Sequence, residues 1–376
     1  MLKNALAVLF GLFVALILLE SLLRLFNPLE IRVRGDRLTL PAETVYEFRD
    51  VRISGIDAHI IHSKNSLGFR GPEPLRTDDE STIKIMAIGG STTEGFYLSD
   101  GKDWPMVMKR TLKKRGYPVW VNNAGLDGHS TYGHQILLED HIIPHQPDIV
   151  VIMAGLNDIG RNPGEERLLR DGLSFDSWNA FIRSAATYSE AAATAIHLHR
   201  VFLAADSGVR HQPLDIRALP QYDEIDYQRI EHDLRWYAEH YTTGYKNRLL
   251  QLIDTAVEAE ITPVLVTQAV LAMNGTDKKT GVDLSRIAYR GGSGYRLWRI
   301  VELYNDATRD VAHQKDIQLI DLSALLPGAH QHKKQSTGQP TEVSRSELFY
   351  DMLHFTNKGA RLTGELIGHQ IEIPSY

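Results

Sequence analysis

A serine follows two glycines in the stretch IKIMAIGGSTTEGFYLSD (83–100), where an apolar, strand-like run ends. Glycines let the chain turn sharply, so Ser91 can project from the edge of a sheet. Backbone N–H groups at the start of a following helix would favour a negative charge developing there. The turn is therefore either the site of a nucleophile or a glycine turn without chemistry.

The residues around this turn exclude three better-known loops. A phosphate-binding loop needs Lys and Ser or Thr after its last glycine, but Phe and Tyr follow Gly95. The G-x-G-x-x-G pattern of dinucleotide-binding proteins is not present in this stretch. The G-x-S-x-G turn of α/β-hydrolases fails as well, because Thr93 stands where its last glycine should be.

Three further segments follow strand-like runs and carry groups that a nucleophilic serine needs. NNAGLDGHS carries Gly128, AGLND carries Asn157, and YDMLHFTNKG carries Asp351 and His354. A serine needs a base to take its proton, and the base needs an orienting carboxylate, which Asp351-x-x-His354 can supply within one turn. The backbone N–H groups of Ser91 and Gly128 and the Asn157 amide could bind an oxyanion.

This order of Ser, Gly, Asn and His, in the blocks GGST, NAGLDG, GLND and DMLH, resembles the SGNH/GDSL hydrolase superfamily. The lead-in NSLGFRGPE (65–73) is similar to that of many members. The resemblance implies that Ser91 is the nucleophile, that Gly128 and Asn157 complete the oxyanion hole with Ser91, that His354 is the base, and that Asp351 orients it. One departure is visible, because the usual Gly-Asp-Ser is Gly-Gly-Ser here.

Other polar residues have simpler interpretations. We expect Asp158 to be a structural hydrogen-bond partner and Glu94 to stabilise the first helical turn. The segment RGGSGYR (290–296) is either a lip over the pocket or a plain loop. No histidine pair is spaced for a metal, and we expect neither a metal nor a cofactor. The histidines considered are His129 and His134 near Gly128, His197 and His199 in a helical region, and His330 and His332 in a polar loop.

The elements that must position these residues alternate between short β-branched runs and amphipathic helical stretches. Such alternation predicts a three-layer α/β/α fold with a five-stranded, flavodoxin-like parallel sheet. The expected strands are 83–88, 118–124, 148–154, 262–268 and 317–322, and the expected helices are 103–116, 131–143, 295–314 and 357–371. We expect a membrane anchor over 1–26, a juxtamembrane lead-in over 27–80, and a hydrolase domain over 81–376 with a helical insertion, mostly a cap or lid, at about 160–261.

The apolar N-terminal stretch (5–19) has no charge over fifteen residues, and apolar residues continue to Phe26. About 20 apolar residues span a bilayer, which requires Glu20 and Arg24 to lie near the interface. A cleaved signal peptide is the alternative, but no A-x-A-like site follows. Arginines at 24, 32, 34 and 37 favour a cytoplasmic domain, whereas the resemblance and Lys3 before the apolar run favour export. We expect an uncleaved anchor and an extracytoplasmic domain.

Composition sets the remaining limits. The chain has 41 basic and 47 acidic residues, a formal charge of -6, so no overall basic field attracts nucleic acid. It has no cysteine, which excludes disulfides and a cysteine nucleophile. The resemblance implies a serine esterase that acts on a small-molecule or glycan ester, with O-acetyl groups on envelope glycans as candidates. The alternatives are an O-acyltransferase using the same residues and a non-catalytic anchored binding module. The sequence identifies no protein partner.

Overall fold

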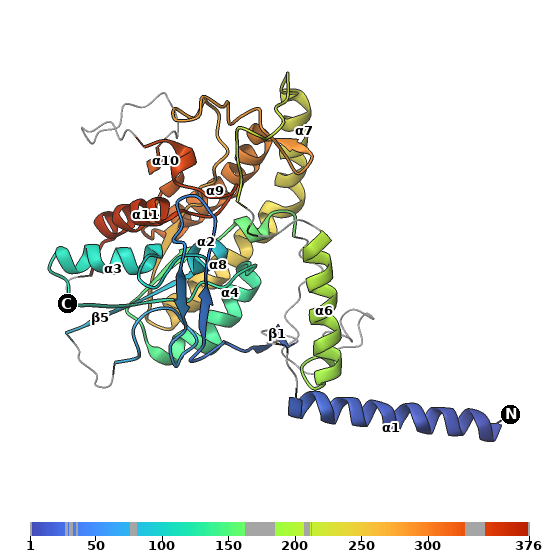
Figure 1. Ribbon diagram of the computed structural model, residues 1–376. Coiled ribbons are helices and arrows are strands. Elements are labelled where there is room, and N and C mark those ends of the chain that lie inside the picture. Colours follow the sequence, from blue (N-terminus) through green and yellow to red (C-terminus); the bar gives the residue numbers. More distant parts are fainter. Residues whose placement is uncertain are drawn as a thin grey trace. The chain divides into compact units, whose positions relative to one another are not determined.

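The computed structural model describes residues 2–26, 29, 33–34, 37–75, 81–161, 185–206, 211, 213–327 and 343–374 (Figure 1). The chain forms two compact units. The first comprises Met1–Pro41 and Arg167–Arg210, and the second comprises Ala42–Glu166 and His211–Tyr376. All of the residues expected to do chemistry belong to the second unit.

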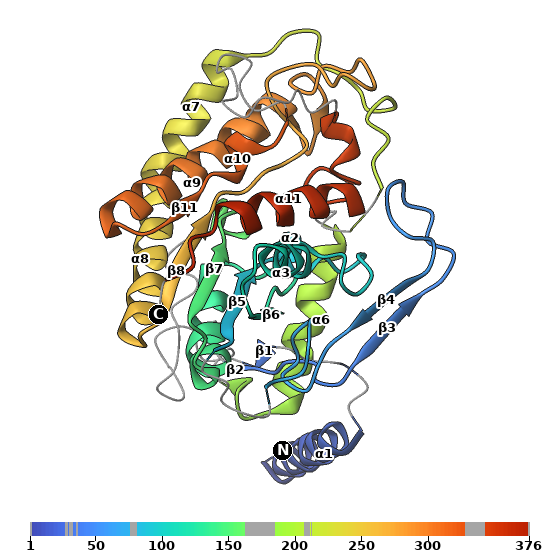
Figure 2. The ribbon, with the colours of Figure 1, turned by 90° about the vertical axis from the view of Figure 1, so that its left-hand side faces the viewer.

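The second unit is built on a parallel sheet in the order β11-β8-β7-β5-β6 (Figure 2). Numbered along the chain, this is the 2-1-3-4-5 order of flavodoxin-like folds, so the predicted fold class is confirmed. Nearly every residue of the central strands is buried, as expected for a parallel sheet covered on both faces. The strands are β5 (Ile83–Gly89), β6 (Val119–Asn123), β7 (Ile149–Met153), β8 (Thr262–Val266) and β11 (Leu319–Ile320).

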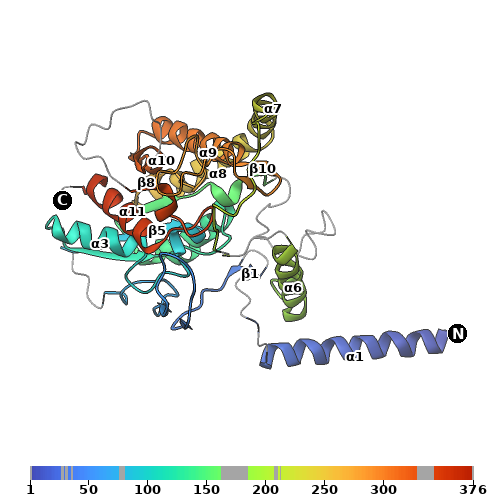
Figure 3. The same ribbon diagram turned by 45° about the horizontal axis from the view of Figure 1, so that its top comes forward.

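Helices cover the sheet in two groups. The helix α3 (Trp104–Lys114) packs against α11 (Asn357–Gln370), and α8 (Thr243–Glu258) packs against both α4 (Thr131–Leu137) and α9 (Gly294–Lys315). The first two lie side by side in each view (Figures 2 and 3). Their close approach depends on glycine in α11, because a Cβ at Gly364 would lie 2.5 Å from the carbonyl oxygen of Trp104.

Smaller elements complete both units. In the second they are the hairpins β3 (Val45–Phe48) with β4 (Ile60–Ser63) and β9 (Ala288–Tyr289) with β10 (Gly292–Ser293), the helices α2 (Ser91–Glu94), α7 (Tyr227–Tyr237) and α10 (Leu322–Leu325), and the helical turns η1 (Leu138–Ile142), η2 (Ile143–His145), η3 (Leu156–Asp158), η4 (Ala238–Thr242) and η5 (Arg345–Glu347). The first unit contains α1 (Leu2–Phe26), α6 (Glu190–Asp206) and the pair β1 (Val33–Arg34) and β2 (Arg37–Leu38). The expected lip at 290–296 is the end of the β9–β10 hairpin and the start of α9, which Ser293 caps.

The expected helical insertion at about 160–261 is divided between the units. Helix α6 belongs to the first unit, whereas α7 and α8 belong to the second. Because α8 runs directly into β8 and packs beside α4 and α9, it is an ordinary crossover of the sheet rather than part of a cap. Residues 162–184, 207–210 and 212 of this stretch lie outside the described residues.

In the first unit, the exposed helix α1 is long and apolar enough to cross a membrane from Lys3 to Phe26, and a signal sequence at this place would have the same properties. The last turns of α1 carry the charged residues Glu20 and Arg24, whose partners lie in the same unit. The Glu20 carboxylate accepts hydrogen bonds from the Ser189 hydroxyl at 2.9 Å and from the Glu190 N–H at 3.0 Å, at the start of α6. Arg24 donates to Glu20 at 2.7 Å.

The compact second unit begins at Ala42, not at residue 81, because the lead-in packs on the turn that carries Ser91. Arg70 exchanges two backbone hydrogen bonds with Asn123 of β6, at 2.8 and 3.0 Å. Its buried guanidinium donates to the carbonyl oxygens of Glu94, Gly95 and Leu98 at 2.6–2.7 Å. The lead-in is therefore a structural part of the turn that carries Ser91.

A buried ion pair joins the same two segments. Lys64 Nζ lies 2.8 Å from Glu94 Oε1, and both side chains are 0% exposed. The other Glu94 oxygen accepts the backbone N–H of Asp127 at 2.6 Å. From the sequence we expected Glu94 to stabilise the first helical turn. In the structure its carboxylate instead connects the lead-in, α2 and the loop after β6.

We predict that Lys64→Met destabilises the protein by about 3–5 kcal/mol, because it leaves the Glu94 carboxylate buried without a cation. The double variant Lys64→Met/Glu94→Gln should recover much of this loss, since Gln removes the charge and still accepts the Asp127 N–H. Thermal unfolding of the full chain in detergent measures both. As a control, Lys246→Met removes an exposed ion pair with Asp310 and should cost at most about 1 kcal/mol. Equal losses in the single and double variants would contradict the prediction.

Candidate active site

Ser91 lies at the carboxyl edge of the sheet, two residues after the end of β5 and directly after the glycine pair. The two glycine positions before Ser91 leave no room for a Cβ atom. A Cβ at Gly89 would lie 2.1 Å from Thr93 Oγ1, and a Cβ at Gly90 would lie 2.3 Å from Asn157 Nδ2. The glycines thus allow α2 to start directly against the ends of β5 and β7, which is the switch point where open α/β sheets bind ligands.

The structure brings Ser91, His354 and Asp351 into one hydrogen-bonded chain. His354 Nε2 lies 2.8 Å from Ser91 Oγ, and His354 Nδ1 lies 2.6 Å from Asp351 Oδ2. The other Asp351 oxygen accepts the backbone N–H groups of Leu353 and His354 at 2.8 and 2.7 Å. Burial opposes ionisation of Asp351, but these hydrogen bonds and the His354 ring outweigh it and hold the pKa of the carboxyl below its usual value.

The loop that carries Asp351 and His354 is fixed at both ends. Before it, η5 is closed by a capping box between Ser344 and Glu347. After it, the Thr356 hydroxyl caps α11 through the Gly359 N–H and donates to the Glu347 carbonyl at 2.6 Å. Across it, the Tyr350 N–H donates to the His354 carbonyl at 3.0 Å. These bonds leave the imidazole little freedom to turn away from Ser91.

Three N–H donors belong to the turns that follow β5, β6 and β7. Asn157 Nδ2 donates to the His129 carbonyl at 3.0 Å and, as an amide, retains a second N–H. Within the described residues, the backbone N–H groups of Ser91 and Gly128 have no intramolecular acceptor. Gly128 has φ +73°, and a Cβ there would meet nothing within 4 Å, so space for an oxyanion lies beside it.

The other candidates have structural surroundings. Asp158 is buried and accepts from the Thr131 hydroxyl at 2.5 Å and from Arg248 at 3.1 Å, as a structural partner would. Burial raises its pKa against the opposing effect of these partners. His134 is fully buried, which lowers its pKa to about 4 and keeps the ring neutral. His197 and His199 lie on α6 in the first unit. His330 and His332 lie outside the described residues.

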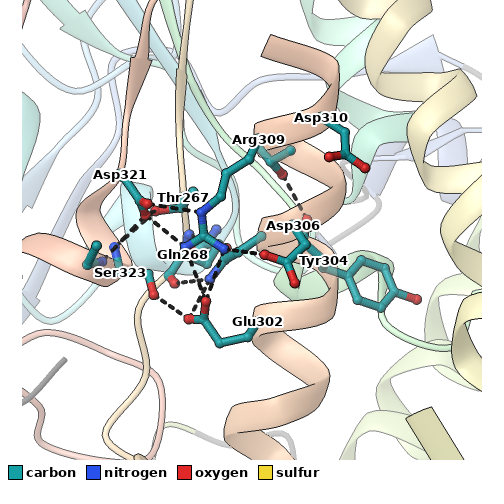
Figure 4. A network of polar contacts seen from close by, with 12 residues as sticks. Thr267, Gln268, Glu302, Tyr304, Asp306, Arg309, Asp310, Asp321 and Ser323 are labelled. Carbon is teal, nitrogen blue, oxygen red and sulfur yellow. Dashed lines mark hydrogen bonds and ion pairs between the residues drawn. The ribbon is translucent and has the colours of Figure 1, made fainter. Parts of the chain in front are cut away.

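A second polar network supports α2 from the β8 side. Gln268, two residues after β8, accepts from the Thr92 hydroxyl at 3.3 Å and donates to the Met153 carbonyl at 3.1 Å. Asn305 of α9 bonds the backbone of Gln268 in both directions. Nearby, Arg309 binds the carboxylates of Glu302, Asp306 and Asp321, so one guanidinium offsets part of the negative charge of this acidic cluster (Figure 4).

One residue that the sequence did not identify, His211, lies directly against the site. Its ring centroid is 4.1 Å from that of His354, and its Nδ1 is 2.7 Å from the Tyr350 hydroxyl. No spacing in the sequence pointed to it, because 143 positions separate it from His354. Lys64 was missed for the same reason, although its neighbours 65–73 were recognised as a lead-in.

His211, Asp351 and His354 also form a group whose potential metal-ligand atoms lie within 4.8 Å of one another. Both nitrogens of His354 already bond Ser91 and Asp351. A metal ion at this position would therefore compete with the contact between the serine and the imidazole.

Comparison with known proteins identifies one family and several similar proteins. The model of the GDSL-like lipase/acylhydrolase family matches residues 87–362. An arylesterase from Vibrio mimicus is 29% identical over 84 residues, which are 22% of this chain and 42% of that protein, so the match spans less than half of the relative. A catalytic mutant of an acetylxylan esterase from Geobacillus stearothermophilus is 13% identical, with a TM-score of 0.42 over 78% of this chain and 95% of the other. A lipase/acylhydrolase from Enterococcus faecalis is 16% identical, with a TM-score of 0.39 over 77% and 94%.

The family match covers more than half of the chain, from β5 into α11, and includes every residue of the hydrogen-bonded chain described above. The chain belongs to the GDSL-like lipase/acylhydrolase family.

Proposed function

We propose that this protein is a serine esterase that cleaves carboxylic esters through an acyl-Ser91 intermediate. The observation that carries the proposal is the chain from Ser91 Oγ to His354 to Asp351, with contacts of 2.8 and 2.6 Å. Such a chain activates a serine hydroxyl, which is otherwise a weak nucleophile.

In the proposed reaction, Ser91 Oγ attacks the ester carbonyl while His354 Nε2 takes its proton. The carbonyl oxygen becomes an oxyanion, within reach of the N–H groups of Ser91, Gly128 and Asn157. His354 then protonates the departing alcohol as the acyl–serine ester forms. Water attacks that ester by the same route and releases the acid. Asp351 holds the imidazole in the tautomer that accepts from serine and stabilises the imidazolium.

We infer that the substrates carry small acyl groups, with O-acetyl groups on envelope glycans as the leading class. One observation supports this inference. The helix α1 has the length and composition of a membrane anchor, and members of the resembled family with such a start commonly act on envelope esters. We further propose that α1 stays uncleaved and that the second unit lies outside the cytoplasm. Arg24 counts little against export, because it is engaged by Glu20 and the Tyr188 carbonyl.

We predict that Ser91→Ala lowers turnover of short-chain aryl esters about 10³-fold or more, because it removes the attacking atom. A serine-reactive fluorophosphonate should modify the wild-type protein on the peptide that contains Ser91, as read by mass spectrometry. Labelling of the variant to the same extent would refute the assignment. Ser99→Ala, at a serine that bonds Asp57, is the matched control and should keep activity.

The same assay separates hydrolysis from acyl transfer. Release of free acid with water as sole acceptor supports an esterase. Turnover that appears only when a sugar alcohol is added would make the protein an O-acyltransferase on the same residues.

We predict that Asp351→Asn lowers kcat roughly 10²–10⁴-fold, because Asn cannot hold the imidazole in its working tautomer. Since the pKa of Asp351 lies below its usual value of about 4, the carboxylate is charged throughout the range from about pH 5 to pH 9. The loss should therefore be similar across that range, instead of disappearing at one end. A variant with wild-type kcat would mean that another acid orients the base.

We predict that alkaline phosphatase fused after residue 40 is active in a bacterial host, because that enzyme matures only outside the cytoplasm. A fusion after residue 2, which lacks the apolar helix, is the control and should be inactive. An inactive but well-expressed fusion at residue 40 would place the second unit in the cytoplasm and remove envelope glycans from the substrate class.

A further inference from the structure

His211 is held against the active site by its own chain segment. Three residues later, the Leu214 N–H donates to the Tyr350 carbonyl at 2.9 Å, and Ile216 is buried in the core. The His211 side chain is 14% exposed. A side chain as covered as this occupies a fixed place instead of sampling solvent.

The ring of His211 is one of the aromatic rings that pack around the base. It packs on His354 at 4.1 Å between centroids, with 37° between the planes. Tyr350 stacks on His354 at 5.6 Å and 15°, and Tyr97 meets His211 edge-on at 5.4 Å. The plane of the His354 imidazole is thus set by neighbouring rings as well as by Asp351.

Both nitrogens of His211 have polar neighbours, and these belong to two different loops. Nδ1 is 2.7 Å from the hydroxyl of Tyr350, in the loop that carries the base. Nε2 is 3.5 Å from Asp127 Oδ2, in the loop that carries Gly128. The backbone N–H of Asp127 is itself held by the buried carboxylate of Glu94. One imidazole therefore connects the base to the proposed oxyanion loop.

We propose that His211 is a positioning residue that aligns the His354 ring and couples it to the Asp127–Gly128 loop. The proposal rests on the esterase mechanism proposed above. Both groups must be correctly placed in the same transition state, because the oxyanion forms as His354 accepts the proton. Displacement of a reacting group by about 1 Å can cost as much as 10²-fold in rate.

The charge of His211 adds a second consequence. Burial disfavours its protonation, but the hydrogen bond and charge of Asp127, with the charges of Asp351 and Glu94, outweigh burial and raise the pKa of His211. The phenol of Tyr350 stays neutral, because burial raises its pKa as well. The other titratable rings facing His211 are those of Tyr97 and His354. A proton on His211 places a positive charge next to the base, since the centroids of the two rings are 4.1 Å apart.

The test is His211→Phe, which keeps a ring and loses both polar contacts. We expect kcat for a short-chain aryl ester to fall about 10-fold with KM changed less than about 2-fold, because the loss is one of alignment. We also expect the acid limb of kcat/KM to move to higher pH by about 0.5 unit or more, since a cation beside the base is removed. His240→Phe is the matched control: His240 also stacks on an aromatic ring, Trp236, and bonds a backbone carbonyl, outside the site.

A plain packing role would leave kcat and the pH profile of His211→Phe at wild-type values, and that result overturns the proposal. If His211→Phe unfolds, Asp127→Asn replaces it, because this half-exposed side chain can be changed without filling or emptying the core. The acid limb of kcat/KM of Asp127→Asn should also move to higher pH, since His211 without the Asp127 charge loses its proton at lower pH. An unmoved limb refutes the proposed link between His211 and the base. Wild-type protein that turns over no ester and resists fluorophosphonate would refute the esterase itself, which is a different outcome.

Discussion

The hydrogen bond between Ser91 Oγ and His354 Nε2 joins two residues that are 263 positions apart and has to hold its length at 2.8 Å. Neither side chain can secure that distance alone, because Ser91 begins the four-residue helix α2 and His354 lies on a loop. The parallel sheet supplies the frame, since its strands end at one edge and release the loops of Ser91, Gly128 and Asn157 side by side. The loop of His354 then approaches that edge from the start of α11, the helix that packs tightly on α3.

Charged groups buried beneath this edge restrict each loop to one conformation. Lys64 with Glu94 fixes the turn after β5, Asp158 with Arg248 fixes the turn after β7, and the buried Arg345 donates to the Val270 carbonyl before the His354 loop. Burying such charges carries a large desolvation cost, so they add less to stability than their short distances suggest. Because an unpaired buried charge is costly, every alternative arrangement of the loops is disfavoured. The site gains positional accuracy from interactions that contribute modestly to folding.

The sequence predicted what is encoded locally. The β-branched runs and glycine turns identified all five strands of the sheet, and the spacing of Asp351 and His354 allowed their contact to be expected. His211 and Lys64 were missed because their partners lie far away in the chain, and no periodicity marks such pairs. The role of α8 was misjudged for a related reason. A long amphipathic pattern predicts a helix but not which surface it covers, and only its neighbours α4 and α9 identify α8 as a sheet crossover.

The first unit poses a separate physical problem at the end of α1. The uncharged stretch 5–19 would be only about 22 Å long as a helix, shorter than the roughly 30 Å of a bilayer core. A span must therefore include the turns that carry Glu20 and Arg24. Their pairing, and the capping of α6 by Glu20, satisfy most of the carboxylate oxygens' hydrogen-bonding capacity. The hydrogen bonds of Glu20 to α6 require the first turn of α6 to lie at the same depth as Glu20. Insertion of α1 would therefore bring the start of α6 to the membrane interface. Membrane insertion and the packing of α6 on α1 are then parts of one equilibrium.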